Sequence, residues 1–240
     1  MKYKQALAAM AALTAVPAAH AQSAHTFYLA TGWFRFMPQD SSDPLKLDSL
    51  GGMPINRSIP NTGTGIDSAD TLGLSGGYFI TDHVAAELEL GIPPKFNLSG
   101  EGQFASFNKI GSARLWAPAL LFKYYFNKPE AKFRPYAGLG VTYAWFTNAR
   151  ITNGSFEQGA LGGPTSVSTD RSWAPVLNAG FNYAFTKHWF AGFSVSFIPI
   201  NVVAKLDTTV DTQVGPLTRV SEAKIHLNPI VTYLKIGYMF

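Results

Sequence analysis

The sequence contains no cysteine, few charged residues and no long hydrophobic run. Without cysteine there is neither a disulfide framework nor a thiolate metal site. Charged residues make up 14% of the chain, whereas soluble proteins carry about 25%. A helix that crosses a bilayer needs about 20 consecutive apolar residues, and no segment reaches that length. The low charge disfavours an ordinary soluble domain, and the missing apolar runs argue against a helical membrane protein.

The N-terminus has the three parts of a secretory signal. Two lysines precede a short apolar run at 6–16, and small residues on either side of a histidine provide a cleavage site that ends at Ala21. We therefore expect residues 1–21 to be a signal peptide, cleaved before Gln22, and 22–240 to be the mature protein. Cleavage removes two lysines and no acid, so the formal charge falls from +4 to +2. This charge gives no electrostatic basis for nucleic-acid binding.

Apolar residues alternate with small or polar ones through the second half of the chain. In segment 133–145 the odd positions are mostly large and apolar, whereas the even positions are mostly glycine, alanine or polar. Segments 173–186 and 189–197 repeat this period of two, which predicts β-strands. The second face carries small residues rather than charges, so the alternation favours a membrane barrel with a narrow lumen over a soluble β-sandwich.

Eight such strands are separated by connections that alternate between short and long. The expected strands cover residues 25–37, 69–80, 84–96, 112–126, 133–147, 172–186, 188–200 and 225–240. Short turns at 81–83, 127–132 and 186–188 alternate with long polar loops at 38–68, 97–111, 148–171 and 207–221. A barrel with both termini in the periplasm needs three short turns and four longer outer loops. The sequence therefore predicts an all-β chain, an eight-stranded antiparallel up-and-down transmembrane β-barrel in the bacterial outer membrane.

Residues opposite the lipid-facing positions are candidates for the barrel lumen. An Arg or Lys that faces lipid near the midplane costs about 2–4 kcal/mol, so the charges within strands are expected to point inward and pair. The expected lumen charge cluster is Arg35, Glu87, Glu89, Lys123, Arg134 and Lys235. The expected apolar lumen above it contains Trp33, Leu115, Ala117, Leu121, Phe190, Val231 and Tyr233. An interior this narrow holds side chains or one small ligand, and its upper part indicates a small apolar solute.

Six prolines fall in or at the ends of expected strands, near the outer membrane interface. They are Pro93, Pro94, Pro118, Pro175, Pro199 and Pro229. Each removes one hydrogen bond from the strand ladder. Two interpretations stay open: the prolines end strand pairing where water begins, or they loosen a lateral seam through which an apolar solute leaves into lipid.

The sequence offers no convincing catalytic or metal-binding set. Residues 73–77 spell the G-x-S-x-G of serine hydrolases, but that motif needs a strand-to-helix turn, and here the serine lies inside an expected strand. No two histidines have the spacing of metal ligands. We therefore expect no enzymatic activity, no metal and no cofactor.

The chain ends in "KIGYMF", in which Gly237, Tyr238 and Phe240 resemble the last-strand signal read by the barrel assembly machinery. Together with "VAAELELGIPP" and the hairpin "PALLFKYYFNKPEAKFRPYAGLGVTYAWF", this ending resembles the outer membrane protein W family of Gram-negative bacteria. The resemblance covers essentially the whole mature chain. It implies a monomeric eight-stranded barrel with a hydrophobic channel that passes small apolar molecules across the outer membrane and out through its wall.

The expected partners are therefore outer-membrane lipid, the barrel assembly machinery and a small apolar solute, without nucleic acid. The residues leave a second function open. A structural or adhesive outer-membrane barrel would act through its extracellular loops and would need no open lumen.

Overall fold

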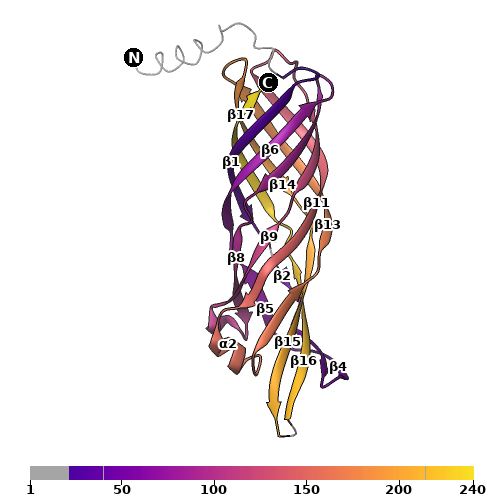
Figure 1. Cartoon of the computed structure of the whole chain (residues 1–240), viewed down its shortest axis with the longest axis vertical. Coiled ribbons are helices and arrows are strands. Elements are labelled where there is room, and N and C mark those ends of the chain that lie inside the picture. Colours follow the sequence, from indigo (N-terminus) through magenta and orange to yellow (C-terminus); the bar gives the residue numbers. More distant parts are fainter. Residues whose placement is uncertain (1–21, 40, 214) are drawn as a thin grey trace, which may run out of the picture.

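The computed structural model describes residues 22–39, 41–213 and 215–240. The expected signal peptide, residues 1–21, lies outside the described residues. The described chain forms one elongated tube, in which β1 begins and β17 ends at the same end (Figure 1). No helix in the part of the chain that the structure describes is long and apolar enough to cross a membrane.

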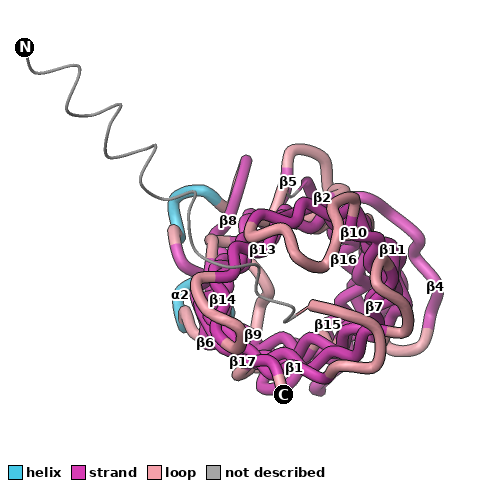
Figure 2. The backbone as a smooth tube through the Cα atoms, turned by 90° about the horizontal axis from the view of Figure 1, so that it is seen from above, coloured by secondary structure: helices cyan, strands magenta, loops and turns pink. Residues whose placement is uncertain are grey.

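Eight antiparallel strands close into a ring, as Figure 2 shows from above. The order of the strands around the ring is β10, β7, β6, β1, β17, β14, β13, β11, and each strand pairs with the next. Pairing of β11 with β10 closes the ring. Their bounds are β1 Phe27–Met37, β6 Ala69–Phe79, β7 Val84–Gly91, β10 Ala119–Tyr125, β11 Phe133–Ile151, β13 Ser172–Ala184, β14 Trp189–Phe197 and β17 Ile230–Met239. The predicted eight-stranded barrel is confirmed.

The outer connections are not the irregular loops that the sequence predicted. They fold into strands and short helices that lengthen the tube away from the chain ends (Figure 1). These elements are β2 Ser41–Ser42, β3 Lys46–Leu50, β4 Met53–Ser58, β5 Thr62–Ile66, β8 Lys95–Gly102, η2 Ala105–Phe107, β9 Lys109–Trp116, α2 Gly154–Gly159, β12 Thr165–Thr169, β15 Asn201–Thr212 and β16 Gly215–His226. In β15, which begins in the unassigned segment 201–206 and continues into the expected loop 207–221, burial alternates: Val202, Leu206 and Thr208 are buried, whereas Lys205 and Asp207 are exposed. This alternation is the strand signal that the loop prediction missed.

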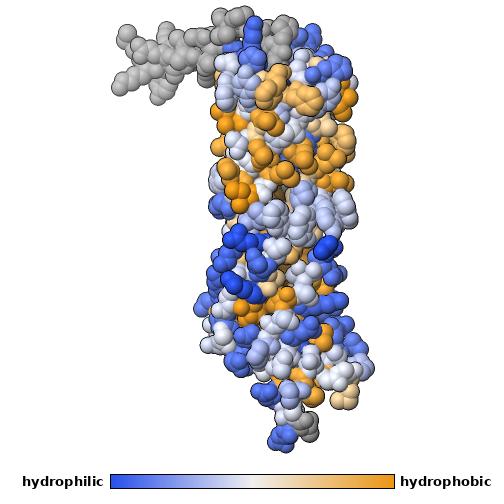
Figure 3. All heavy atoms as spheres, in the orientation of Figure 1, coloured by the Kyte–Doolittle hydropathy of each residue, from blue (hydrophilic) through white to orange (hydrophobic). Residues whose placement is uncertain are grey.

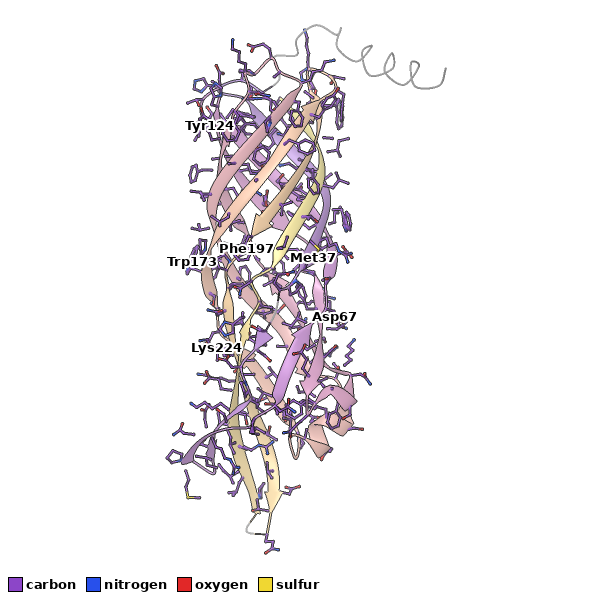
Figure 4. The ribbon with its side chains drawn as sticks, turned by 180° about the vertical axis from the view of Figure 1, so that it is seen from behind. Met37, Asp67, Tyr124, Trp173, Phe197 and Lys224 are labelled. Atoms are coloured by element: carbon purple, nitrogen blue, oxygen red, sulfur yellow. The ribbon has the colours of Figure 1, made fainter. Side chains whose placement is uncertain are left out.

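The part of the tube near the chain ends carries a hydrophobic belt (Figure 3). Large apolar side chains point outward from the barrel strands, among them Leu29, Leu74, Leu88, Leu120, Leu139, Leu177 and Leu234. Figure 4 shows Tyr124 near the end that carries the termini, and Trp173, Phe197 and Met37 at a common level further along the axis. Aromatic rings thus border the belt on both sides, as in the girdles of transmembrane barrels.

The interior near the chain ends is filled by side chains in layers. A first cluster, the aromatic layer, consists of Tyr28, Ala30, Phe79, Ala85, Tyr125, Tyr136, Phe190 and Met239. A layer of charged side chains follows, and then a second cluster that includes Phe34, Leu121 and Tyr233. The interior widens into an apolar cavity in the outer part of that second cluster, whose members Phe96, Val202 and Ile225 line it.

Candidate functional site

Four charged side chains meet inside the barrel, in what we call the charged layer. Glu87 on β7 accepts hydrogen bonds from Lys123 Nζ at 2.8 Å, from Lys235 Nζ at 2.6 Å and from the Tyr28 hydroxyl at 2.5 Å. Glu89 accepts from Lys123 Nζ at 3.1 Å. The side chains of Glu87, Lys123 and Lys235 are fully buried. Buried charges persist when they are paired and hydrogen-bonded, and each charge in this layer has an opposite partner.

A glycine on β6 makes this arrangement possible. Gly77 stands between Tyr28 on β1 and Glu87 on β7 in the strand register. A Cβ atom at Gly77 would lie 2.1 Å from Cζ of Tyr28, which is far inside van der Waals contact. The phenol ring can therefore cross β6 and reach Glu87 only because position 77 has no side chain.

Arg134 is buried inside the barrel, but the prediction that it belongs to the lumen charge cluster was wrong. Its guanidinium donates Nη1–H to the carbonyl oxygen of Gln22 at 2.5 Å, Nη2–H to that of Asp82, and Nε–H to that of Asn127 at 3.2 Å. It also lies 4.8 Å from the ring centroid of Tyr125. Arg134 lies two residues after the turn at 127–132, at the periplasmic end of the barrel. There its guanidinium donates to backbone carbonyls and forms no ion pair with Glu87 or Glu89.

Trp33 and Arg35 lie on the outside of the barrel, so their predicted places in the lumen were wrong. Arg35 forms an ion pair with Asp70 at 3.2 Å, and Trp33 Nε1–H donates to Asp70 at 3.0 Å. Phe34, between them, is buried. At the outer end of β1 an outward charge no longer faces hydrocarbon, and Asp70 on the neighbouring strand β6 neutralises it.

Phe190 points inward, but it lies at the wrong end for the predicted upper lumen. It belongs to the aromatic layer and packs edge-on against Tyr28 at 5.7 Å. A Cβ atom at Gly237 would lie 2.2 Å from the Phe190 ring, so the glycine of the C-terminal pattern makes room for this ring.

The other two residues of the C-terminal pattern also make contacts near the chain end. The Tyr238 ring stacks on the His188 ring with centroids 5.2 Å apart, and the amide of Phe240 donates to the carbonyl of Phe27 at 2.9 Å.

The remaining predicted lumen residues surround the axis beyond the charged layer. Tyr233 stacks on Phe34 with ring centroids 3.9 Å apart, and Leu121 is fully buried beside them. Leu115, Ala117 and Val231 line the space above. This apolar stack lies between the charged layer and the main cavity, described next.

The main cavity lies within the outer part of the tube and measures about 110 Å³. Its wall is almost entirely apolar and includes Phe36, Phe96, Phe104, Phe146, Phe156 and Leu206. Phe104 and Phe156 come from segments expected to be loops, and Leu206 from a segment assigned to neither a strand nor a loop, so these wall residues were not predicted. The alternation of buried and exposed residues in β15 was the available signal. Near this wall, burial lowers the pKa of the Arg219 guanidinium, which donates to the carbonyl oxygen of Leu161.

A smaller cavity of about 40 Å³ leads from the main cavity toward the barrel wall. The two share Phe36 and Leu115 in their linings. Toward the periplasmic end, the smaller cavity is lined by Glu89 of the charged layer. In the barrel wall, it is lined by Leu90, Gly91, Pro94 and Ala117.

The wall beside the smaller cavity has a gap in its hydrogen bonds. The β7–β10 ladder ends at the Glu89–Ala119 pair, and the next bond across the wall runs from the Leu115 amide to the Pro94 carbonyl at 3.2 Å. Between these points, no backbone hydrogen bond joins residues 90–93 to 116–118, all of which the structure describes. We call this break in backbone pairing the lateral gap; Pro93 and Pro118 lie in it, and Pro94 lies at its end.

The other three prolines of the predicted seam do not border this gap. Pro175 and Pro199 would face each other if the β13–β14 register continued beyond Leu177 and Phe197, and neither lines a cavity found among the described residues. Pro229 lines the main cavity, but its carbonyl accepts from the Ile198 amide at 3.2 Å, so pairing continues there. Backbone pairing is interrupted at Pro175 and Pro199 as well, because the next backbone bond beyond Leu177–Phe197 joins the Asp170 amide to the Val203 carbonyl. The wall therefore has more than one break in pairing, and three of the six prolines border the one described above.

Comparisons with known proteins agree with this architecture. The model of the OmpW family matches residues 25–240. The chain belongs to the OmpW family. Outer membrane protein W of Vibrio cholerae is 30% identical over 237 residues, which cover 98% of this chain and 97% of that protein.

Two solved OmpW-like barrels share the fold. The crystal structure of OprG from Pseudomonas aeruginosa has a TM-score of 0.80 at 24% identity and covers 92% of this chain and 98% of its own. The structure of outer membrane protein AlkL in lipid bilayers has a TM-score of 0.58 at 19% identity, with 94% and 95% coverage.

OmpW membership confirms the predicted location, the bacterial outer membrane, where the hydrophobic belt lies in the lipid bilayer. The serine of the G-x-S-x-G match, Ser75, is buried within β6 and has no helix after it. Among the described residues, no cluster of three or more histidine or acidic side chains could hold a metal ion.

For this OmpW-family barrel we predict that deletion of Phe240 reduces the amount of folded protein in the outer membrane. The deletion removes the last backbone bond between the C-terminus and β1, together with the terminal aromatic ring. The folded fraction is measured by heat-dependent migration of membrane extracts in gel electrophoresis. Phe240→Tyr, which keeps the ring, is the matched control and should assemble normally. Normal assembly of the deletion would contradict the prediction.

Proposed function

We propose that the protein, as a monomer inserted by the barrel assembly machinery, lets small hydrophobic molecules cross the outer membrane through its apolar interior. The solute enters the main cavity from outside, moves into the smaller cavity and leaves through the lateral gap into lipid. The observation that carries the proposal is that an apolar cavity adjoins a second cavity, with which it shares Phe36 and Leu115, and that this second cavity lies beside a break in the backbone pairing of the wall.

A sideways exit is favoured because the axial route is filled. Below the smaller cavity, an apolar solute would have to pass the Phe34–Tyr233 stack and then the Lys123–Glu87–Lys235 ion pairs. Separating buried charges costs several kcal/mol, because each would lose its partner without gaining water. The aromatic layer and Arg134 then close the periplasmic end. The lateral gap needs none of these contacts to break.

Solute uptake by liposomes tests the proposal. Liposomes that contain the folded barrel should take up an apolar dye or a monocyclic aromatic compound faster than protein-free liposomes do, whereas a sugar of similar size should enter both at the same rate. Heat-unfolded protein in the same lipid is the second control. If no apolar solute distinguishes barrel from empty liposomes, the proposed function is wrong.

One observation favours a second function, that of a structural or adhesive barrel. All six residues of β4 are exposed, and this strand forms the edge of the outer sheet. An adhesive barrel would lose function when segments 38–68 and 148–171 are shortened, and would keep it when Ala117 or Ala119 is replaced by a bulky residue. A transport barrel would lose uptake upon the bulky replacement.

A further inference from the structure

Two cations stand directly opposite each other on the outer surface of the wall. Lys95 on β8 and Arg114 on β9 are register partners, and both are exposed. Their neighbours Phe96 and Ala113 line the main cavity on the inner side, so the two charged side chains share the outer face. Like charges directly opposite in an antiparallel pair destabilise the sheet.

No acid among the described residues neutralises this cation pair. Neither Lys95 nor Arg114 forms an ion pair in the described structure, in contrast to Arg35, which pairs with Asp70. Asp67 is on the adjacent chain segment, where its amide donates to the Asn97 carbonyl, but its carboxylate contacts neither cation. The pair therefore presents two positive charges outward.

The cation pair lies at the level where lipid headgroups begin. On the outward face of β9, Arg114 is two residues beyond Trp116, whose ring stacks parallel to that of Trp145 with centroids 5.8 Å apart. Stacked rings of this kind mark the boundary between hydrocarbon and headgroups. Figure 3 shows strongly hydrophilic side chains immediately beyond the hydrophobic belt, and Figure 1 shows β8 and β9 entering that region.

We propose that Lys95 and Arg114 bind a phosphate group of lipopolysaccharide, the phosphorylated glycolipid of the outer leaflet. A guanidinium can hold two phosphate oxygens in a bidentate contact, and a lysine ammonium adds a point charge. The bound phosphate neutralises the like-charge pair, and the acyl chains below it lie against the Trp116–Trp145 stack. The outer leaflet supplies this anion at the depth of the pair, which a freely dissolved phosphate does not.

The proposed site also lies at the upper end of the lateral gap. The bond between the Leu115 amide and the Pro94 carbonyl, which ends the gap, is one residue from each cation. Acyl chains held here pass over the lateral gap. The existence of the site does not depend on solute transport, because the charge pair and its depth are independent of the cavities.

Binding of purified lipopolysaccharide to the folded full-length mature barrel in detergent micelles tests the proposal. The double variant Lys95→Gln/Arg114→Gln should bind lipopolysaccharide about tenfold more weakly or worse, since losing one charged hydrogen bond already accounts for about a factor of ten. The matched control is Lys205→Gln, which removes one exposed cation whose register partner is Glu222, and it should bind normally. Arg114→Lys keeps the charge and should restore part of the affinity lost in Arg114→Gln.

The outcomes separate the lipid from other anions. Heat-dependent migration first verifies that each variant is folded. Unchanged affinity in the double variant, or an equal loss in Lys205→Gln, would overturn the proposal. If inorganic phosphate competes as well as lipopolysaccharide at equal phosphate concentration, the ligand is a free anion. If micelles of phosphatidylglycerol bind equally well, the site recognises any anionic surface. Either result would overturn the assignment to lipopolysaccharide.

Discussion

Replacing Glu87 with glutamine should lower the free energy of unfolding of the barrel by about 3–5 kcal/mol, the range found when one partner of a buried ion pair is removed. Among the residues that the structure describes, Glu87 is the only acid within hydrogen-bonding distance of Lys235, and it also accepts from Lys123 and Tyr28. Glutamine is nearly the same size, so the loss comes from unpaired buried charge and not from a cavity. Urea titration of barrels folded into lipid vesicles, followed by tryptophan fluorescence, measures the change.

Two matched substitutions make this result specific to the charged layer. Glu89→Gln should cost less than Glu87→Gln, because Lys123 keeps its bond to Glu87. Asp70→Asn breaks the half-exposed pair with Arg35 and should change stability by about 1 kcal/mol or less. If Asp70→Asn destabilises the barrel as much as Glu87→Gln does, the buried network has no special role in stability.

The expectation that charged side chains within strands point inward held in the middle of the barrel and failed for Arg35, at the outer end of β1. Near the midplane, lipid excludes charge from one face, so Glu87, Lys123 and Lys235 could only point inward. At the outer end of β1 that constraint disappears, and the Arg35 side chain points outward, where it forms an ion pair with Asp70. The sequence could not show this pairing, because it depends on the register between β1 and β6.

Arg134 shows a different limit of the same reasoning. Its inward direction follows from parity, but its partners are backbone carbonyls of two turns, at Asp82 and Asn127, and of the N-terminal residue Gln22. Carbonyl groups are present at every position, so composition does not identify which ones accept. Only the folded arrangement of the periplasmic end brings them together.

The main cavity could not be predicted because its wall is assembled from distant segments. Phe96, Phe146 and Phe156 come from β8, β11 and α2, and each follows or precedes residues typical of loops. Their shared inward direction depends on how the outer strands continue the barrel. The two prolines at 93 and 94 did indicate a break in pairing, and the lateral gap includes Pro93 and ends at Pro94.

Replacing Gly91 with leucine should reduce uptake of an apolar solute to about the level of empty liposomes, without unfolding the barrel. Gly91 lines the smaller cavity at the lateral gap. A Cβ atom there would lie 3.6 Å from Thr71 Cγ2 and 3.7 Å from Phe34 Cδ2, which are ordinary van der Waals distances, so the backbone need not move. The rest of the leucine side chain would then occupy the smaller cavity and block the way from the main cavity to the lipid.

The matched control adds the same side chain where no cavity exists. Gly159 lies in α2, outside the membrane belt, and a Cβ atom there would have nothing within 4 Å; Gly159→Leu should therefore leave uptake unchanged. Initial rates of dye uptake into liposomes with equal amounts of folded barrel compare the two variants. A folded Gly91→Leu barrel that transports at the unaltered rate would show that solute does not leave through the lateral gap. If solute leaves along the axis instead, the ion pairs of the charged layer must open during transport, and Glu87→Gln would then alter the uptake rate as well as stability.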